Sequence, residues 1–304
     1  METWSKLAVL ALQISIVAQV FAIGLGTTWR DATYLFRTPR LLGNSILARN
    51  VAVPIISMLL IKVSGFHAAM AITLGVLALT PVPPLLPASQ LKTGGRSEYV
   101  LGLLVSQSVL AIVLVPVTAT LMDWALGSQT HFSAVQVAEA VFKTILLPLA
   151  AGMLAFRYLP KSGHLAPTLL TVGAVLLIAG ALPLLLLAWN AFAVLSGNGA
   201  MLALALFILG GTAVGHMLGG PLPEDRTVLA VATASRHPGL ALAIAKANYP
   251  EYTKLVAGAV VIYLIFRLLL ALPYIHWRRH PPLGSPRPQA PPVHFPPGLA
   301  GPRR

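Results

Sequence analysis

Long apolar segments divide most of the chain, and they constrain its fold more than any other feature. Nine segments approach or exceed the roughly 20 residues with which a helix crosses a bilayer. Charged residues make up only 10% of the chain, against about 25% in soluble domains. We therefore expect an all-α polytopic membrane protein with nine transmembrane helices and the lipid bilayer as its surroundings. The segments lie near residues 6–27, 41–61, 67–91, 98–122, 134–156, 165–189, 199–219, 225–248 and 254–277.

Basic residues alternate between the two sides of these segments. The net charge is +13, but the bases stand singly between apolar segments, so we expect no nucleic-acid partner. Cytoplasmic connections carry the excess of Lys and Arg. This bias predicts a multi-pass plasma (inner) membrane protein with its N-terminus outside and its C-terminus in the cytoplasm. The connections predicted to be cytoplasmic hold Arg30, Arg37, Arg40, Lys92, Arg96, Arg157, Lys161, Arg226, Arg278 and Arg279.

The composition changes after the last apolar segment. Residues 1–279 form the transmembrane domain, whereas residues 280–304 contain nine prolines in 25 positions. Such a sequence cannot build a packed core, so we expect a disordered or polyproline-II cytoplasmic tail. A role of this tail as a proline-rich ligand stays open. The chain has no cysteine, which excludes disulfides and thiolate metal sites.

Two of the apolar segments contain proline-rich interruptions. The third ends in Thr80-Pro81-Val82-Pro83-Pro84-Leu85-Leu86-Pro87, and the eighth contains Arg236-His237-Pro238-Gly239. Proline removes a backbone hydrogen bond, and irregular backbone at membrane depth survives only where protein or water satisfies it. The interruptions fall at corresponding places in the two halves. This predicts inverted repeats whose broken helices meet at a midplane binding site, although ordinary proline kinks are the alternative.

Arginines stand in the middle of three segments, at Arg49, Arg236 and Arg267. Arg236 lies ten residues beyond Arg226, or about 15 Å along a helix, which is close to the bilayer centre. No carboxylate lies at a comparable depth, so the counter-charge is a bound anion, freed backbone carbonyls or water in a cavity. We favour the anion because a guanidinium matches carboxylate, sulfonate or phosphate. His216 is expected to bond a neighbouring helix, and His237 makes proton coupling conceivable.

Several classes of site are missing from the sequence. We find no His/Asp/Glu cluster with metal-ligand spacing, no phosphate-cradling loop and no nucleophile elbow. The chain is therefore not expected to be an enzyme or to hold a cofactor. Its oligomeric state is not readable from the sequence.

Four motifs, taken in order, resemble the bile acid:sodium symporter family over residues 15–278. They are Ile23-Gly24-Leu25-Gly26, Lys143-Thr144-Ile145-Leu146-Leu147-Pro148 with Gly152, Leu222-Pro223-Glu224-Asp225-Arg226, and Arg236-His237-Pro238-Gly239-Leu240. The resemblance implies a fold shared with sodium/proton antiporters. A panel domain would hold the segments near 6–27, 134–156 and 165–189, and a core domain those within 41–122 and 199–277. A small organic anion would bind between panel and core.

This chain departs from the family at the positions that bind sodium. On ungapped matching these fall on Leu86, Pro87, Val100, Leu104, Ala232, Arg236 and Arg49. Sodium needs several hard oxygen ligands, which leucine, valine and alanine side chains do not offer. Our hypothesis is that Arg49 and Arg236 replace the ion as fixed positive charges.

These observations predict a secondary transporter of a small organic anion that works by alternating access, without the usual sodium sites. Arg49 and Arg236 would hold the crossing and contact the anion. Alternatives are a degenerate transporter acting as a membrane receptor or scaffold, and a proton-coupled antiporter of similar fold, against which the missing mid-membrane carboxylate speaks. The remaining predicted site residues are Asn50, Thr233, Ser235, His237, Ser89 and Gln90, with Pro81, Pro84, Pro87 and Pro238 shaping the breaks.

Overall fold

The protein is mostly helical in the part of the chain that its computed structural model describes, namely residues 2–63, 65, 67–83, 95–127, 139, 141–197 and 199–279. No strand occurs among these residues, so the all-α prediction is confirmed. Six of the described helices are long and apolar enough to span a membrane. They are Pro39–Val63, Ser97–Leu126, Lys161–Gly180, Ala200–Leu218, Pro223–Asn248 and Pro250–Arg278, with shorter apolar helices at Gln13–Gly24 and Ala68–Leu79.

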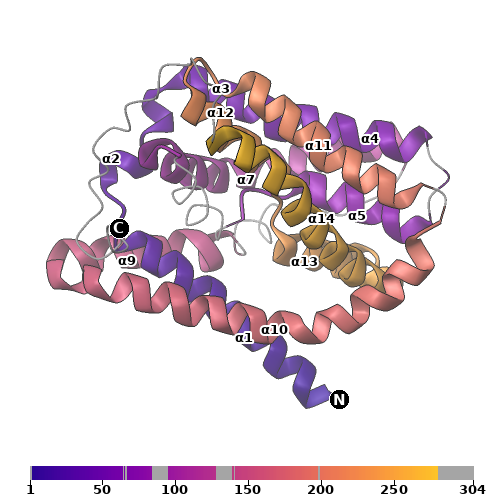
Figure 1. Cartoon of the computed structure of the whole chain (residues 1–304), viewed down its shortest axis with the longest axis horizontal. Helices are drawn as coiled ribbons and strands as arrows, with labels where there is room; N and C mark the ends of the chain where they lie inside the picture. Colours follow the sequence, from indigo (N-terminus) through magenta and orange to yellow (C-terminus); the bar gives the residue numbers. More distant parts are fainter. Residues whose placement is uncertain are drawn as a thin grey trace.

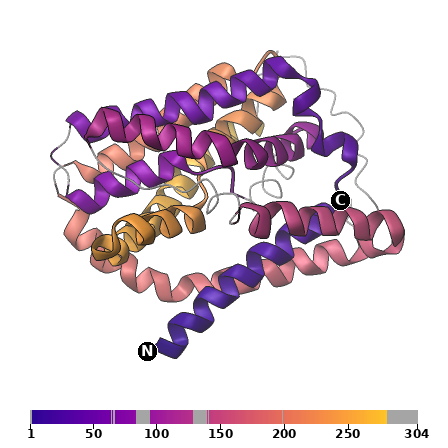
Figure 2. The ribbon, with the colours of Figure 1, turned by 180° about the vertical axis from the view of Figure 1, so that it is seen from behind.

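One layer of the molecule consists of α1 (Glu2–Gly24), α9 (Leu147–Tyr158) and α10 (Leu165–Leu195). We call it the panel layer; it crosses the lower part of Figure 1 and is seen from behind in Figure 2. Glycines allow α1 and α9 to touch. A Cβ on Gly24 would collide with the carbonyl of Leu149, and one on Gly152 with the carbonyl of Phe21. The glycine of the Lys143–Gly152 motif is thus a helix-packing residue.

The second layer, called the core layer here, contains the remaining long helices. A π-helical turn, η2 (Leu47–Ala52), joins α3 (Pro39–Ile46) to α4 (Val53–Val63) within one continuous helix. This helix packs with α5 (Ala68–Leu79), α7 (Ser97–Leu126) and α11 (Ala200–Leu218). The layer is completed by α12 (Pro223–Ala234), α13 (Pro238–Asn248) and α14 (Thr253–Arg279).

A row of three glycines places α12 directly against α11. Gly211, Gly215 and Gly219 recur every four residues on α11 and its C-terminal end. A Cβ on Gly215 would lie 2.6 Å from the Cα of Ala230, and one on Gly211 would lie 3.2 Å from the carbonyl oxygen of Thr233. Small residues with this spacing let helix backbones approach closely. The three glycines thus fix how α12 lies along α11, and with it the place where α12 ends.

Both predicted helix breaks occur. Helix α5 ends at Leu79, and residues 80–83 are not helical. Helix α12 ends at Ala234, and α13 begins at Pro238, where a missing N–H costs nothing. The second break therefore lies ahead of the proline, at residues 235–237, and Pro238 starts a helix rather than loosening one.

Some sequence predictions fall outside the described residues. These are Pro84, Leu86, Pro87, Ser89 and Gln90, the first part of the segment expected at 134–156, and the tail at 280–304.

Candidate functional site at the crossing of two broken helices

The two breaks lie against each other in the centre of the core layer. The backbone N–H of His237 donates to Oγ1 of Thr80 at 3.1 Å, and the same hydroxyl donates to the carbonyl of Leu77 at 2.9 Å. Thr80 is 2% exposed and His237 is 5% exposed. The end of α5 is therefore tied to the start of α13 in the interior of the protein.

Arg236 crosses from the second break to the first. Its guanidinium donates from Nη1 to the carbonyl oxygens of Thr80 at 3.2 Å, Arg49 at 3.4 Å and Ala78 at 3.5 Å. The side chain is 1% exposed. Thr80 and Ala78 stand at the end of α5, where a helix leaves its last carbonyls without internal partners and carries partial negative charge. Arg236 neutralises that end.

Arg49 makes the reciprocal contact. It lies in the π-helical turn η2 and is also 1% exposed. Its Nη1 donates to the carbonyl of Ala232, and its Nη2 donates to the carbonyl of Ser235 at 3.4 Å. These oxygens belong to the end of α12 and the residue after it. The two arginines thus each bind the C-terminal carbonyls of one broken helix, and we call this pair of contacts the arginine brace.

Of the three counter-charges that the sequence leaves open, the brace contains the freed carbonyls. They accept hydrogen bonds from the terminal nitrogens of both guanidiniums. One buried atom of each side chain, Nε of Arg49 and Nε of Arg236, has no hydrogen-bond partner within the described part of the chain. Both arginines are sealed away from solvent, so in this conformation neither can touch a dissolved anion.

Helix α14 contributes two side chains that sequence reasoning left out of the site. The hydroxyl of Tyr263 donates to the carbonyl of Ala234 at 2.7 Å and accepts the backbone N–H of Arg236 at 2.7 Å. Nε of Arg267 donates to Oγ of Ser235 at 2.9 Å. Unlike the brace arginines, Arg267 keeps part of its side chain exposed. The sequence does contain a signal for both residues, because a phenol or a guanidinium inside an apolar segment needs a polar partner there.

The remaining predicted residues mostly satisfy local backbone. The hydroxyl of Thr233 donates to Leu229 at 2.7 Å, and that of Ser235 donates to Val231 at 2.6 Å. Nδ1 of His237 accepts the N–H of Leu240 at 3.2 Å and caps α13. Asn50 is half-buried, with its Oδ1 unpartnered among the described residues. Pro81 lies, buried, in the non-helical stretch after α5.

Apolar packing surrounds three of the described positions at which the sequence comparison expected sodium ligands, and the arginine brace occupies two others, Arg49 and Arg236. Val100, Leu104 and Ala232 belong to one buried cluster and are 1%, 0% and 0% exposed. Their neighbours in this cluster include Val82 and Tyr99. Among the described residues, no group of three or more His, Cys, Asp or Glu side chains could hold a metal ion. His216 bonds a neighbouring helix as expected, through Nδ1 and the Tyr274 hydroxyl at 2.8 Å.

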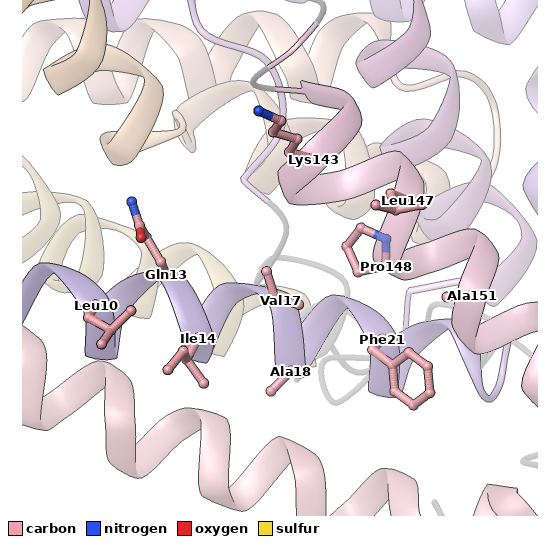
Figure 3. Close-up of a pocket in the computed structure, with 10 residues that line it drawn as sticks. All are labelled: Leu10, Gln13, Ile14, Val17, Ala18, Phe21, Lys143, Leu147, Pro148 and Ala151. Atoms are coloured by element: carbon pink, nitrogen blue, oxygen red, sulfur yellow. The ribbon is translucent and has the colours of Figure 1, made fainter.

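A pocket of about 490 Å³ lies beside α1 in the panel layer (Figure 3). Its walls come from α1, the π-helical turn η3 (Phe142–Leu146) and the start of α9. Two of its lining residues are polar, Gln13 and Lys143, and the polar ends of both rise above α1 in Figure 3. Lys143 pairs with Glu139 at 2.5 Å on the protein surface. The pocket suits an apolar group with a polar end.

Comparison with known proteins agrees with this architecture. The sequence model of the sodium bile acid symporter family matches residues 13–205, which is more than half of the chain. A search of curated proteins finds no match.

Proposed function

The chain belongs to the sodium bile acid symporter family, whose members are membrane transporters rather than enzymes, and we propose that it carries a small organic anion by alternating access without the family's usual sodium sites. In this proposal nine helices span the membrane with the N-terminus outside. Two inverted repeats form the core, which moves against the panel layer around the crossing. Residues 1–279 act as one transporter domain.

The arginine brace is the observation that carries the proposal. At the crossing, two fixed guanidiniums already neutralise the ends of α5 and α12. A sodium ion in the same place would face both positive charges and the apolar side chains of Val100, Leu104 and Ala232. It would gain no side-chain oxygen from any of these three. The protein carries its positive charge at the crossing permanently.

We assign the contact with the anion to Arg267 rather than to the brace. Arg267 lies at the second break, is bound through Nε to Ser235, and retains exposed surface. A guanidinium held through one nitrogen still offers its outer N–H groups as a planar fork for a carboxylate or sulfonate.

Transport in proteoliposomes tests this function. Organic anions are first screened by thermal shift on the purified protein, with sodium and with choline as the only added cation. The best binder is then followed by uptake under both conditions. We expect binding and flux to persist in choline; flux abolished by sodium removal contradicts the proposal. Binding without any flux in either medium indicates a receptor or scaffold instead.

Substitution at Arg267 locates the anion site. Arg267→Gln is expected to weaken anion binding by about tenfold or more, as the loss of a charge-assisted contact does. Arg157→Gln removes the same charge at an exposed position at the end of α9 and serves as the control. If both variants bind the anion as the unchanged protein does, Arg267 is not the contact.

A further inference from the structure

A second pocket, of about 440 Å³, lies in the core layer, and its inner end reaches Leu79 at the end of α5, next to the crossing. One wall is a single face of α5, with residues spaced by three and four along the helix, and the other is a face of α7 with the same spacing. The turn η5 (Pro250–Tyr252) and Tyr249 line its outer end. The α5 wall consists of Ala68, Ala71, Ile72, Gly75, Val76 and Leu79, and the α7 wall of Ala119, Met122, Asp123 and Leu126.

The inner part of this pocket is apolar and buried. Val76, Leu79, Ala119 and Met122 are each at most 6% exposed, whereas Ala68 at the start of α5 is exposed. Gly75 leaves the space between the walls open, because a Cβ built on it meets only the methyl carbon of Met122, at 4.0 Å. The pocket therefore runs inward from the ends of the helices as an apolar trough between α5 and α7.

The outer part combines carboxylates with phenol rings. Asp123 and Glu251 line it together with Tyr249 and Tyr252. The pKa of Tyr249 is raised above its ordinary value, mainly by burial and to a smaller extent by the negative charges of Asp123 and Glu251. Both carboxylates therefore act on the same phenol. None of the described residues that line the pocket is cationic, although the chain carries 21 Lys and Arg against 8 Asp and Glu. The ionisable side chains among the described lining residues are therefore carboxyl groups and phenols.

We propose that this pocket binds a free amphiphilic organic ammonium compound, with its flat apolar body between α5 and α7 and its ammonium group among Asp123, Glu251, Tyr249 and Tyr252. Aromatic faces and carboxylates are the groups that recognise organic ammonium ions. The pocket shares no lining residue with the arginine brace or with Arg267. It is therefore a second site, of opposite charge preference, and does not depend on the proposed anion transport.

A lipid headgroup with an ammonium group shares this chemistry, and the proposal commits to a free ligand as the occupant. The polar lining residues lie near the C-terminal end of α7 and where α13 meets α14. The trough itself lies between two helices of the core layer, with buried residues at its inner end. An ammonium compound that enters from the outer end with its apolar body first leaves its ammonium group at that end, beside the carboxylates.

A matched pair of probes tests the proposal on the full chain in nanodiscs of phosphatidylglycerol. The cation is 1-naphthylmethylammonium and the anion is 1-naphthaleneacetate, which share one apolar body. We expect the cation to bind and to raise the melting temperature, both in the unchanged protein and in Arg267→Gln. The proposal is wrong if the cation and the anion bind this pocket equally well, because the pocket then does not select for charge. Loss of both probes in Gly75→Leu would show that both bind here.

Two kinds of variant separate the trough from the charged end. Gly75→Leu fills the trough and should abolish binding of the cation, whereas Gly43→Leu, at a position with nothing within 4 Å, should not. Glu251→Gln, at an exposed residue, should weaken binding about tenfold, as the loss of about 1.4 kcal/mol does. Glu224→Gln is its control. Unchanged affinity in Glu251→Gln overturns the proposal even if Gly75→Leu fails to fold.

Replacing phosphatidylglycerol by phosphatidylcholine tests the lipid as occupant. A free ligand site should bind the naphthyl cation with the same affinity in both membranes. If choline lipid abolishes binding, its headgroup occupies the pocket, and the assignment to a free ligand is wrong.

Discussion

At the scale of the residue, the buried arginines are matched by backbone rather than by acids. Burying an arginine with a carboxylate would take two ions out of water, whereas burying a guanidinium against the end of a helix takes only one. The desolvation cost is therefore smaller. Among the oxygens that Arg49 and Arg236 bind, those of Ser235 and Thr80 lie just beyond the ends of α12 and α5, where helix carbonyls lack partners within the helix. One side chain thus supplies both a counter-charge and the missing donors.

Arg236→Met should therefore destabilise the protein strongly. It leaves the carbonyls of Thr80, Ala78 and Arg49 without their side-chain donor, and we expect a loss of about 3–5 kcal/mol in the free energy of unfolding. Arg267→Met removes one bond to Ser235 and should cost only about 1 kcal/mol. Denaturant unfolding in mild detergent measures both. Equal losses in the two variants would show that the brace has no special structural role.

The sequence predicts where such a site lies but not how its members pair. Pro81 and Pro238 mark both breaks: Pro81 lies in the non-helical stretch after α5, and Pro238 is the first residue of α13, where its missing N–H is tolerated. The partners of Arg236 are backbone atoms 156 to 187 residues away, and no side-chain pattern encodes them. Tyr263 shows no local signal beyond being a phenol in an apolar segment. The sequence alone favours a bound anion as the counter-charge and leaves backbone carbonyls as one of three alternatives.

At the scale of the element, glycine spacing sets how close the helices lie. The contact between α11 and α12 depends on Gly215, and that between α1 and α9 on Gly24 and Gly152. The glycine rows are visible in the sequence, but which helix each faces is not. The π-helical turn around Arg49 was also not predicted, because its residues read as ordinary helix formers. Such turns are frequent at functional sites.

Gly215→Ala tests the packing of α11 on α12. The added methyl group would lie 2.6 Å from the Cα of Ala230, and backbone cannot move aside as a side chain can. We expect a loss of about 1–3 kcal/mol, as in other overpacked interiors. In Gly43→Ala the methyl group meets nothing within 4 Å, so helix propensity should stabilise that variant by up to about 1 kcal/mol. A neutral Gly215→Ala would mean that the two helices separate readily.

At the scale of the whole molecule, the panel and core layers place the two breaks in the interior and leave the connections at both ends. The family match and the six long apolar helices establish a multi-pass membrane protein. The direction of the chain through the membrane stays a prediction from its basic residues.

The absence of cysteine makes this direction easy to measure. A single cysteine can be introduced at Lys161 or at Lys254, both exposed and on opposite predicted sides. In intact cells an impermeant maleimide should label Lys254→Cys, and should label Lys161→Cys only after permeabilisation. The reverse pattern would place the N-terminus in the cytoplasm.

The arginine brace has a consequence for the energy source of transport. A bound sodium ion crosses with its substrate and brings the ion gradient with it, but a guanidinium stays in the protein. A carrier built in this way moves a monovalent anion as a net negative charge. An inside-negative potential of 100 mV then favours outward movement by about 2.3 kcal/mol. The electrical field across the membrane, rather than a salt gradient, would set the direction of net flux.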